Sequence, residues 1–149
     1  MLRTLLVTLV ALILAVLVTT ILGSIIQTQF NLGFLQALDV DIPFSTRVLT
    51  TGQDLLGFAP AWAALVAATF VPAFLVAWLA NYLLPVGPAL LYPLAGFCGI
   101  VAAILLVNAA LGLTPIAATR LLSGLVSMGL AGAVGGWVFH RCTRPWTAG

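Results

Sequence analysis

The chain has 149 residues, of which 63% are hydrophobic and 5% are charged, with five basic residues against three acids. A water-soluble globule of this size needs far more polar surface, so the composition excludes a soluble protein and predicts one that is built for lipid. The scarcity of basic residues also excludes a nucleic-acid partner, because no basic patch is present to contact phosphates.

Four long apolar runs predict four transmembrane helices, since a crossing needs about 20 residues to span a hydrocarbon core of about 30 Å. The runs are residues 4–26, 60–83, 89–111 and 115–139. They are continuous and show no alternation, which favours helices over outer-membrane strands. We therefore expect an all-α integral membrane protein with a single four-helix domain, in which residues 140–149 form a short tail.

The first run, residues 4–26, follows a single basic residue, Arg3, as a secretory signal would. The apolar stretch is longer than a typical signal core, and the small residues of a cleavage site are missing. A cut after Ser24, for example, would have Leu22 two residues before it. We expect an uncleaved transmembrane helix.

The segment between the first two runs, residues 27–59, is too apolar for a flexible loop. Apolar residues recur every four positions from Phe30, which suits a short helix lying along the membrane surface. After a break at residues 39–43, a second short helix is predicted to begin after Ser45 and to stop at Gly57. We expect this extramembrane segment to cap the mouth of the bundle, as a lid over a cavity, as a surface for a partner or as a plain packing cap.

The second run carries tryptophans near both ends, Trp62 and Trp78, where indole rings favour the headgroup region. Pro72 lies in its middle and predicts a kink, because proline removes a backbone hydrogen bond and clashes with the preceding turn. Two prolines and a glycine in residues 85–88 then end the helix and turn the chain into the third run.

The fourth run is predicted to begin with Thr114 as N-cap and Pro115 at the first helical position, after a helix stop at Gly112. Small residues repeat along it at four-residue spacing, and such faces let two helices approach closely in lipid. We expect a helix-packing interface there, either with the third helix or with another subunit in a homo-oligomer or larger membrane complex. The candidate interface residues are Ser123, Ser127, Gly132 and Gly136.

Arg120 is expected about a turn and a half into the fourth helix, where its charge must reach the membrane surface or pair with an acid. Several polar residues are predicted at the same level and make a candidate cluster for an anionic headgroup or a small solute. The alternative is that Arg120 marks the membrane surface and the amides are solvated. The candidate cluster consists of Arg120, Asn108, Gln27, Gln29 and Asp54.

The arginines also predict the orientation, because Arg3, Arg141 and Arg144 fall on one side of four crossings and only Arg47 and Arg120 on the other. The positive-inside rule then places both termini in the cytoplasm. The small size and short loops favour a bacterial cytoplasmic (inner) membrane.

Residue types for catalysis or metal binding are scarce. The chain has one histidine, His140, and its two cysteines form no Cys-x-x-Cys pair; nucleophile-elbow and phosphate-loop motifs do not occur. We expect no enzyme activity, no cofactor and no metal. The expected function is a non-catalytic structural or accessory subunit in contact with membrane lipids; the alternative is a small transporter or a lipid- or solute-binding protein that uses the cluster at Arg120.

Overall fold

The computed structural model describes residues 2–147, and this part of the chain is helical and contains no strand. The elements are α1 (Leu2–Gln36), α2 (Phe44–Gly57), α3 (Ala59–Leu83), α4 (Pro88–Leu111), a 3-10 helix η1 (Ala117–Arg120) and α5 (Leu122–Thr147). Four of these helices, α1, α3, α4 and α5, are long and apolar enough to cross a membrane. The prediction of an all-α fold with four candidate membrane spans is confirmed.

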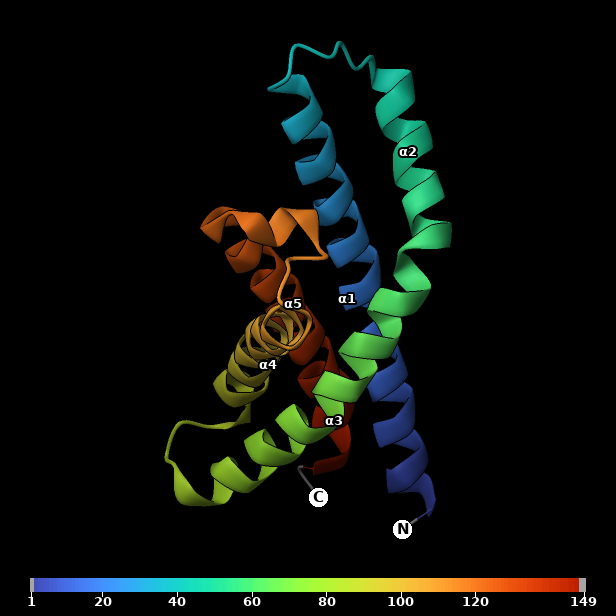
Figure 1. The fold of residues 1–149 in the computed structure, drawn as a ribbon. Coiled ribbons are helices and arrows are strands. Elements are labelled where there is room, and N and C mark those ends of the chain that lie inside the picture. The colour runs from blue at the N-terminus through green and yellow to red at the C-terminus, as the bar shows by residue number, and fades with distance from the viewer. Residues whose placement is uncertain (1, 148–149) are drawn as a thin grey trace.

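The four long helices form a ring in which α5 is the most buried. Of the apolar span of α5, 44% of the residues are buried, against 22% in each of the other three. α5 packs against α4 and α1, and α3 completes the ring by contacting both of them. The start of α1 and the last turns of α5 lie at the same end of the molecule (Figure 1), which we call the terminal end.

Close packing of α4 on α5 depends on glycine. A Cβ atom at Gly96 would overlap the carbonyl oxygen of Gly132, and one at Gly136 would overlap the carbonyl oxygen of Tyr92. The backbones are therefore in direct contact, as small residues permit in lipid. Gly132 and Gly136 are thus buried against α4 of the same chain.

The two serines of the candidate interface lie elsewhere. Ser123 is exposed and Ser127 is half-buried, and the hydroxyl of Ser127 donates to the carbonyl oxygen of Ser123 at 2.8 Å. The predicted row of small residues therefore divides, and only its glycines take part in the contact with α4.

A second row of small residues runs along α1 and faces α5. Ala11, Ala15 and Thr19 follow one another at four-residue spacing, and each is 0% exposed. The hydroxyl of Thr19 occupies the space that a side chain at Gly135 would need, and it donates to the carbonyl oxygen of Ala131 at 3.3 Å. α5 therefore packs against small residues of α4 on one side and of α1 on the other.

α1 is longer than predicted. It continues without interruption to Gln36, so residues 27–36 extend the first crossing and do not form a separate surface helix. At about 1.5 Å per residue its 35 residues reach roughly 52 Å, well beyond a hydrocarbon core of about 30 Å. The chain turns only after Gln36, where Asp39 adopts a left-handed conformation with φ of 61°.

The predicted second short helix is present as α2, which begins at Phe44 after Pro43 and ends at Gly57. It runs back beside the last turns of α1, and Figure 1 shows that the two extend well beyond η1 and the neighbouring turns of α5. We call this unit, residues 27–57, the α1/α2 hairpin. It projects from the end of the bundle opposite to the terminal end.

The fourth crossing begins later than predicted. Gly112 ends α4 with φ of 66°, as expected, but residues 113–116 are not helical, and α5 starts only at Leu122 after η1. Arg120 is therefore the last residue of η1 and not part of the fourth crossing. α5 then continues to Thr147, so most of the predicted tail is helical. The predicted bounds of the second and third crossings agree with α3 and α4 to within one residue.

Candidate functional site

The interior of the bundle contains a column of polar side chains on one face of α1. Thr20, Ser24 and Thr28 follow one another at four-residue spacing, Thr19 and Gln27 lie beside them, and all five are buried. The column continues onto α2 at Asp54, which is half-buried. We call these six residues the polar column.

Two hydrogen bonds connect the polar column to other elements. The hydroxyl of Thr28 donates to Asp54 Oδ2 at 2.7 Å and also lies 2.9 Å from the carbonyl oxygen of Ser24. The backbone N–H of Ala118 in η1 donates to Gln27 Oε1 at 2.9 Å. The column thus fastens both α2 and η1 to α1.

Three buried polar atoms at the α1/α3 contact have no hydrogen-bond partner within residues 2–147. They are Thr20 Oγ1, Ser24 Oγ and Trp62 Nε1. The indole nitrogen of Trp62 lies directly against the backbone of Gly23, so all three atoms belong to one small region. Buried polar groups usually find a partner, so two unpaired hydroxyls and an unpaired N–H in one region are unusual.

The position of Trp62 corrects the expectation of an interfacial anchor. Its side chain is only 2% exposed, because the absence of a side chain at Gly23 lets the ring enter the α1/α3 contact. Trp78, at the other end of α3, is 51% exposed, as expected for a residue near the headgroups.

The α1/α2 hairpin is joined by polar contacts. Arg47 donates to Gln29 Oε1 at 2.9 Å and also to Gln36 Oε1, and Gln29 donates to the hydroxyl of Thr51 at 3.3 Å. Together with the bond between Thr28 and Asp54, these contacts direct the polar side of α2 toward α1. Arg47 therefore acts as a bridge between the two helices.

The large apolar residues of α2, except the half-buried Leu55, lie on the exposed side of this helix. No residue of α2 is buried, and its large apolar side chains are mostly exposed. We call them the outer face of α2; they are Phe44, Val48, Leu49 and Leu56. This is the reverse of an ordinary surface helix, which turns its apolar side inward.

The structure brings together part of the candidate cluster. Gln27 and Asp54 belong to the polar column, and Gln29 belongs to the hairpin contacts. Arg120 is exposed and forms no hydrogen bond or ion pair with any residue in the described part of the chain. Asn108 is half-buried, and its Oδ1 has no partner within the same part of the chain.

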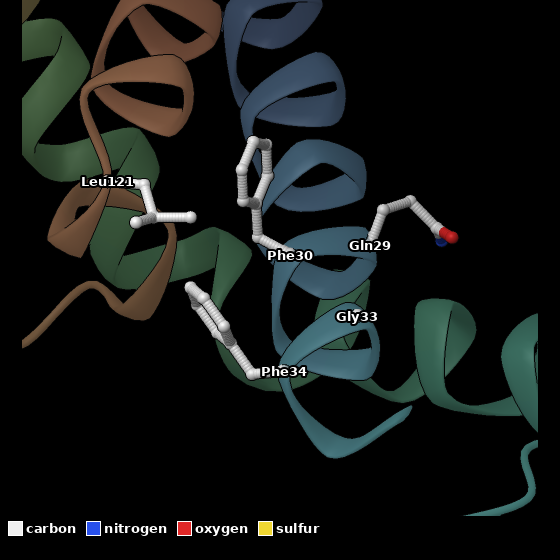
Figure 2. A pocket seen from close by; sticks show the side chains of 5 residues that line it. All are labelled: Gln29, Phe30, Gly33, Phe34 and Leu121. Atoms are coloured by element: carbon white, nitrogen blue, oxygen red, sulfur yellow. The ribbon is translucent and has the colours of Figure 1, made fainter. Parts of the chain in front are cut away.

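A shallow groove of about 380 Å³ separates Gln29 from the η1/α5 junction. Figure 2 shows Phe30, Phe34 and Leu121 around this groove, whereas the amide of Gln29 points to the opposite side, toward α2. The groove is apolar, so the region next to Arg120 is not the polar cluster that the sequence predicted.

Sequence reasoning missed most of the polar column. The signal was present in the four-residue spacing of Thr20, Ser24 and Thr28, but it lies within one of the most apolar runs of the chain. Threonine and serine can donate to a carbonyl oxygen of their own helix, so isolated hydroxyls in such a run carry little information. Their common face becomes significant only when another helix covers it.

Within residues 2–147 no three His, Cys, Asp or Glu side chains come close enough to hold a metal ion. No family model matches the chain, and neither does any curated protein or solved structure. The polar column, the reversed hairpin and the cavities are therefore the features from which function can be argued.

We expect Arg47→Ala to loosen α2 from α1, because this side chain alone bridges α2 to both Gln29 and Gln36. The contacts are exposed, so the free energy of unfolding should fall by less than about 1 kcal/mol. Hydrogen exchange of the α2 amides should nevertheless become faster, since local opening is easier than global unfolding. Arg120→Ala is the matched control and should leave this exchange unchanged; a larger effect of Arg120→Ala would restore it as the centre of the cluster.

Proposed function

We propose that this chain is a non-catalytic membrane subunit that contacts a partner membrane protein through the outer face of α2. The observation that carries the proposal is the reversed hairpin, in which Arg47 and Asp54 contact α1 while Leu49 and Leu56 are exposed. Leu49 and Leu56 lie two turns apart and are 63% and 84% exposed. Exposed apolar patches of this kind mark interaction surfaces.

A partner protein explains the outer face better than lipid alone. The hairpin extends beyond the neighbouring parts of the bundle (Figure 1), and α1 exceeds the length of one crossing by about 20 Å. With the four spans centred in the bilayer, we place Phe44 and Val48 beyond the hydrocarbon core and Leu56, three residues before α3, near its edge. Apolar side chains at that height are better covered by protein than by water.

The outer face of α2 replaces the glycines of α5 as the proposed contact surface. Gly132 and Gly136 are buried against α4, so a partner would first have to separate two helices of the same chain. Either a different protein or a second copy of this chain can provide the apolar surface that the outer face needs.

For the location, we propose a bacterial cytoplasmic membrane with both termini in the cytoplasm. Arg3, Arg141 and Arg144 at the terminal end outnumber Arg47 and Arg120 at the other, as the positive-inside rule requires for this orientation. The hairpin would then project on the periplasmic side, where its partner must be accessible.

A second candidate function is the binding of a small polar solute. It is favoured by the three unpaired atoms of Thr20, Ser24 and Trp62, which offer hydrogen bonds inside the bundle. A solute-binding protein should retain its ligand when it is purified alone, whereas an accessory subunit should be purified with its partner.

Native mass spectrometry of the protein, extracted gently from its own membrane, tests the main proposal. We expect one complex of fixed stoichiometry, and the variant with Leu49→Gln and Leu56→Gln should release the partner. These residues are exposed, so the variant should unfold at nearly the same temperature as the wild type.

The matched control is Leu111→Gln with Leu113→Gln, two exposed leucines at and just beyond the end of α4 that should leave the complex intact. Retention of the partner by the α2 variant would contradict the proposed contact surface. A wild-type monomer that carries only a small polar molecule would support the solute-binding alternative.

A further inference from the structure

A second cavity, of about 440 Å³, lies at the terminal end of the bundle between α1 and α3. All four membrane-crossing helices contribute to its lining, which makes it different from the shallow groove at Leu121. Its volume is within the range of about 300–1,000 Å³ that is usual for ligand sites. We call it the aromatic pocket.

The inner wall of the aromatic pocket is buried and apolar. It is formed by Phe70, Phe74 and Phe139, which are at most 6% exposed. The rings of Phe74 and Phe139 stack with centroids 4.5 Å apart, and Tyr92 meets the ring of Phe74 edge-on at 5.7 Å. A wall of buried aromatic rings favours a hydrocarbon ligand over a polar one.

The mouth of the pocket faces the surrounding lipid. On α3 it is bordered by Val71, Leu75 and Trp78, each more than half exposed, and on α1 by the exposed residues Thr4 and Thr8. The hydroxyl of Thr8 donates to the carbonyl oxygen of Thr4 at 3.0 Å. The hydrogen of the Thr8 hydroxyl is therefore used within α1 and is not offered to an occupant of the pocket.

The depth of the pocket matches one leaflet of a bilayer. Along α1 its lining extends from Thr4 to Leu12, which is nine residues, or eight steps of about 1.5 Å and hence about 12 Å of helix. One leaflet contributes about half of a hydrocarbon core of about 30 Å. A single acyl chain entering from the terminal end can therefore lie along the pocket.

Basic residues adjoin lining residues of the pocket along the chain. Arg3 directly precedes the lining residue Thr4, and Arg144 directly follows the lining residue Thr143. Arg141 is nearby on α5, with its guanidinium 5.5 Å from the ring of Trp137. The three acids of the chain all lie in residues 39–54, at the opposite end of the bundle, so the charged side chains at this end are basic within the described residues.

We propose that the aromatic pocket binds one acyl chain of an anionic phospholipid, whose headgroup is held by Arg3 and Arg144. The aromatic rings contact the acyl chain, and the arginines favour a headgroup with negative charge. Each arginine near an anionic lipid surface contributes about 1 kcal/mol, which corresponds to about five-fold in affinity.

The test is a competition in mild detergent. The purified full chain is incubated with equal amounts of phosphatidylglycerol and phosphatidylcholine that have identical acyl chains, and retained lipids are counted by native mass spectrometry. We expect one retained phosphatidylglycerol in preference to phosphatidylcholine. In the variant with Arg3→Gln and Arg144→Gln the preference should fall by up to ~25-fold, because two contributions of about five-fold are lost.

Filling the pocket should remove binding of both lipids, so Val71→Trp is the second variant. Its matched control is Leu106→Trp, at an exposed position on α4 outside the pocket, and the control for charge is Arg47→Gln at the opposite end. Equal retention of both lipids by the wild type would overturn the proposal. So would a loss of lipid in Leu106→Trp as large as in Val71→Trp, or a loss of preference in Arg47→Gln as large as in the double arginine variant.

Discussion

Replacing Gly96 by alanine is expected to lower the free energy of unfolding by about 1–3 kcal/mol, the usual cost of overpacking. A Cβ atom at this position would overlap the backbone carbonyl of Gly132. A backbone atom cannot rotate away as a side chain can, so α4 and α5 must separate. Because α5 also packs against α1, the displacement should spread to a second contact. Thermal unfolding in detergent measures the loss.

Gly33→Ala provides the matched control, since it makes the same chemical change in another long helix. A Cβ atom at Gly33 would have no neighbour within 4 Å. Alanine favours helix over glycine by up to about 1 kcal/mol, so this variant should be as stable as the wild type or slightly more stable. If both variants lost the same stability, the close approach of α4 and α5 would not be what Gly96 provides.

The crossings themselves could be predicted because their signals are local. The apolar runs of α3 and α4 end at clusters of proline and glycine, and these signals placed both helices to within one residue. The stop at Gly57 was predicted in the same way, from a glycine after an amphipathic stretch. Local backbone preferences are sufficient wherever no distant contact competes with them.

The start of α5 could not be predicted, because a contact with a residue far away in the sequence holds the segment before it. The sequence at Thr114 and Pro115 satisfies the rules for a helix start, yet the chain there is not helical. Gln27 accepts a hydrogen bond from Ala118, a residue 91 positions away, and this bond holds η1 against α1. Local sequence contains no trace of such a pairing.

The candidate site shows the same limit. Gln27, Gln29 and Asp54 were expected at one level of the bundle, but the level of a residue does not determine the direction in which its side chain points. Gln29 points toward α2, whereas the chain near Arg120 lies on the other side of α1 (Figure 2). Helical spacing indicates which residues share a face, and only the packed structure shows what that face meets.

Gln27→Leu is expected to release η1 from α1 and to lower the free energy of unfolding by about 1–3 kcal/mol, the cost of a buried donor without a partner. The side chain is only 6% exposed, and its Oε1 accepts the backbone N–H of Ala118 at 2.9 Å. Leucine has a similar size but no acceptor, so the variant removes the hydrogen bond and leaves the volume nearly unchanged. Hydrogen exchange in residues 117–121 should accelerate along with the loss of stability.

Two further variants separate the hydrogen bond from other effects of the substitution. Gln27→Glu keeps an acceptor, because a buried carboxyl favours its neutral form and retains a carbonyl oxygen, so it should preserve most of the protection of η1. Gln53→Leu makes the same chemical change at an exposed position on α2 and should alter neither stability nor exchange. Normal protection of residues 117–121 in Gln27→Leu would mean that η1 is held by its apolar contacts alone. With protection lost in Gln27→Leu and kept in Gln27→Glu, the polar column is what joins the start of the fourth crossing to the first.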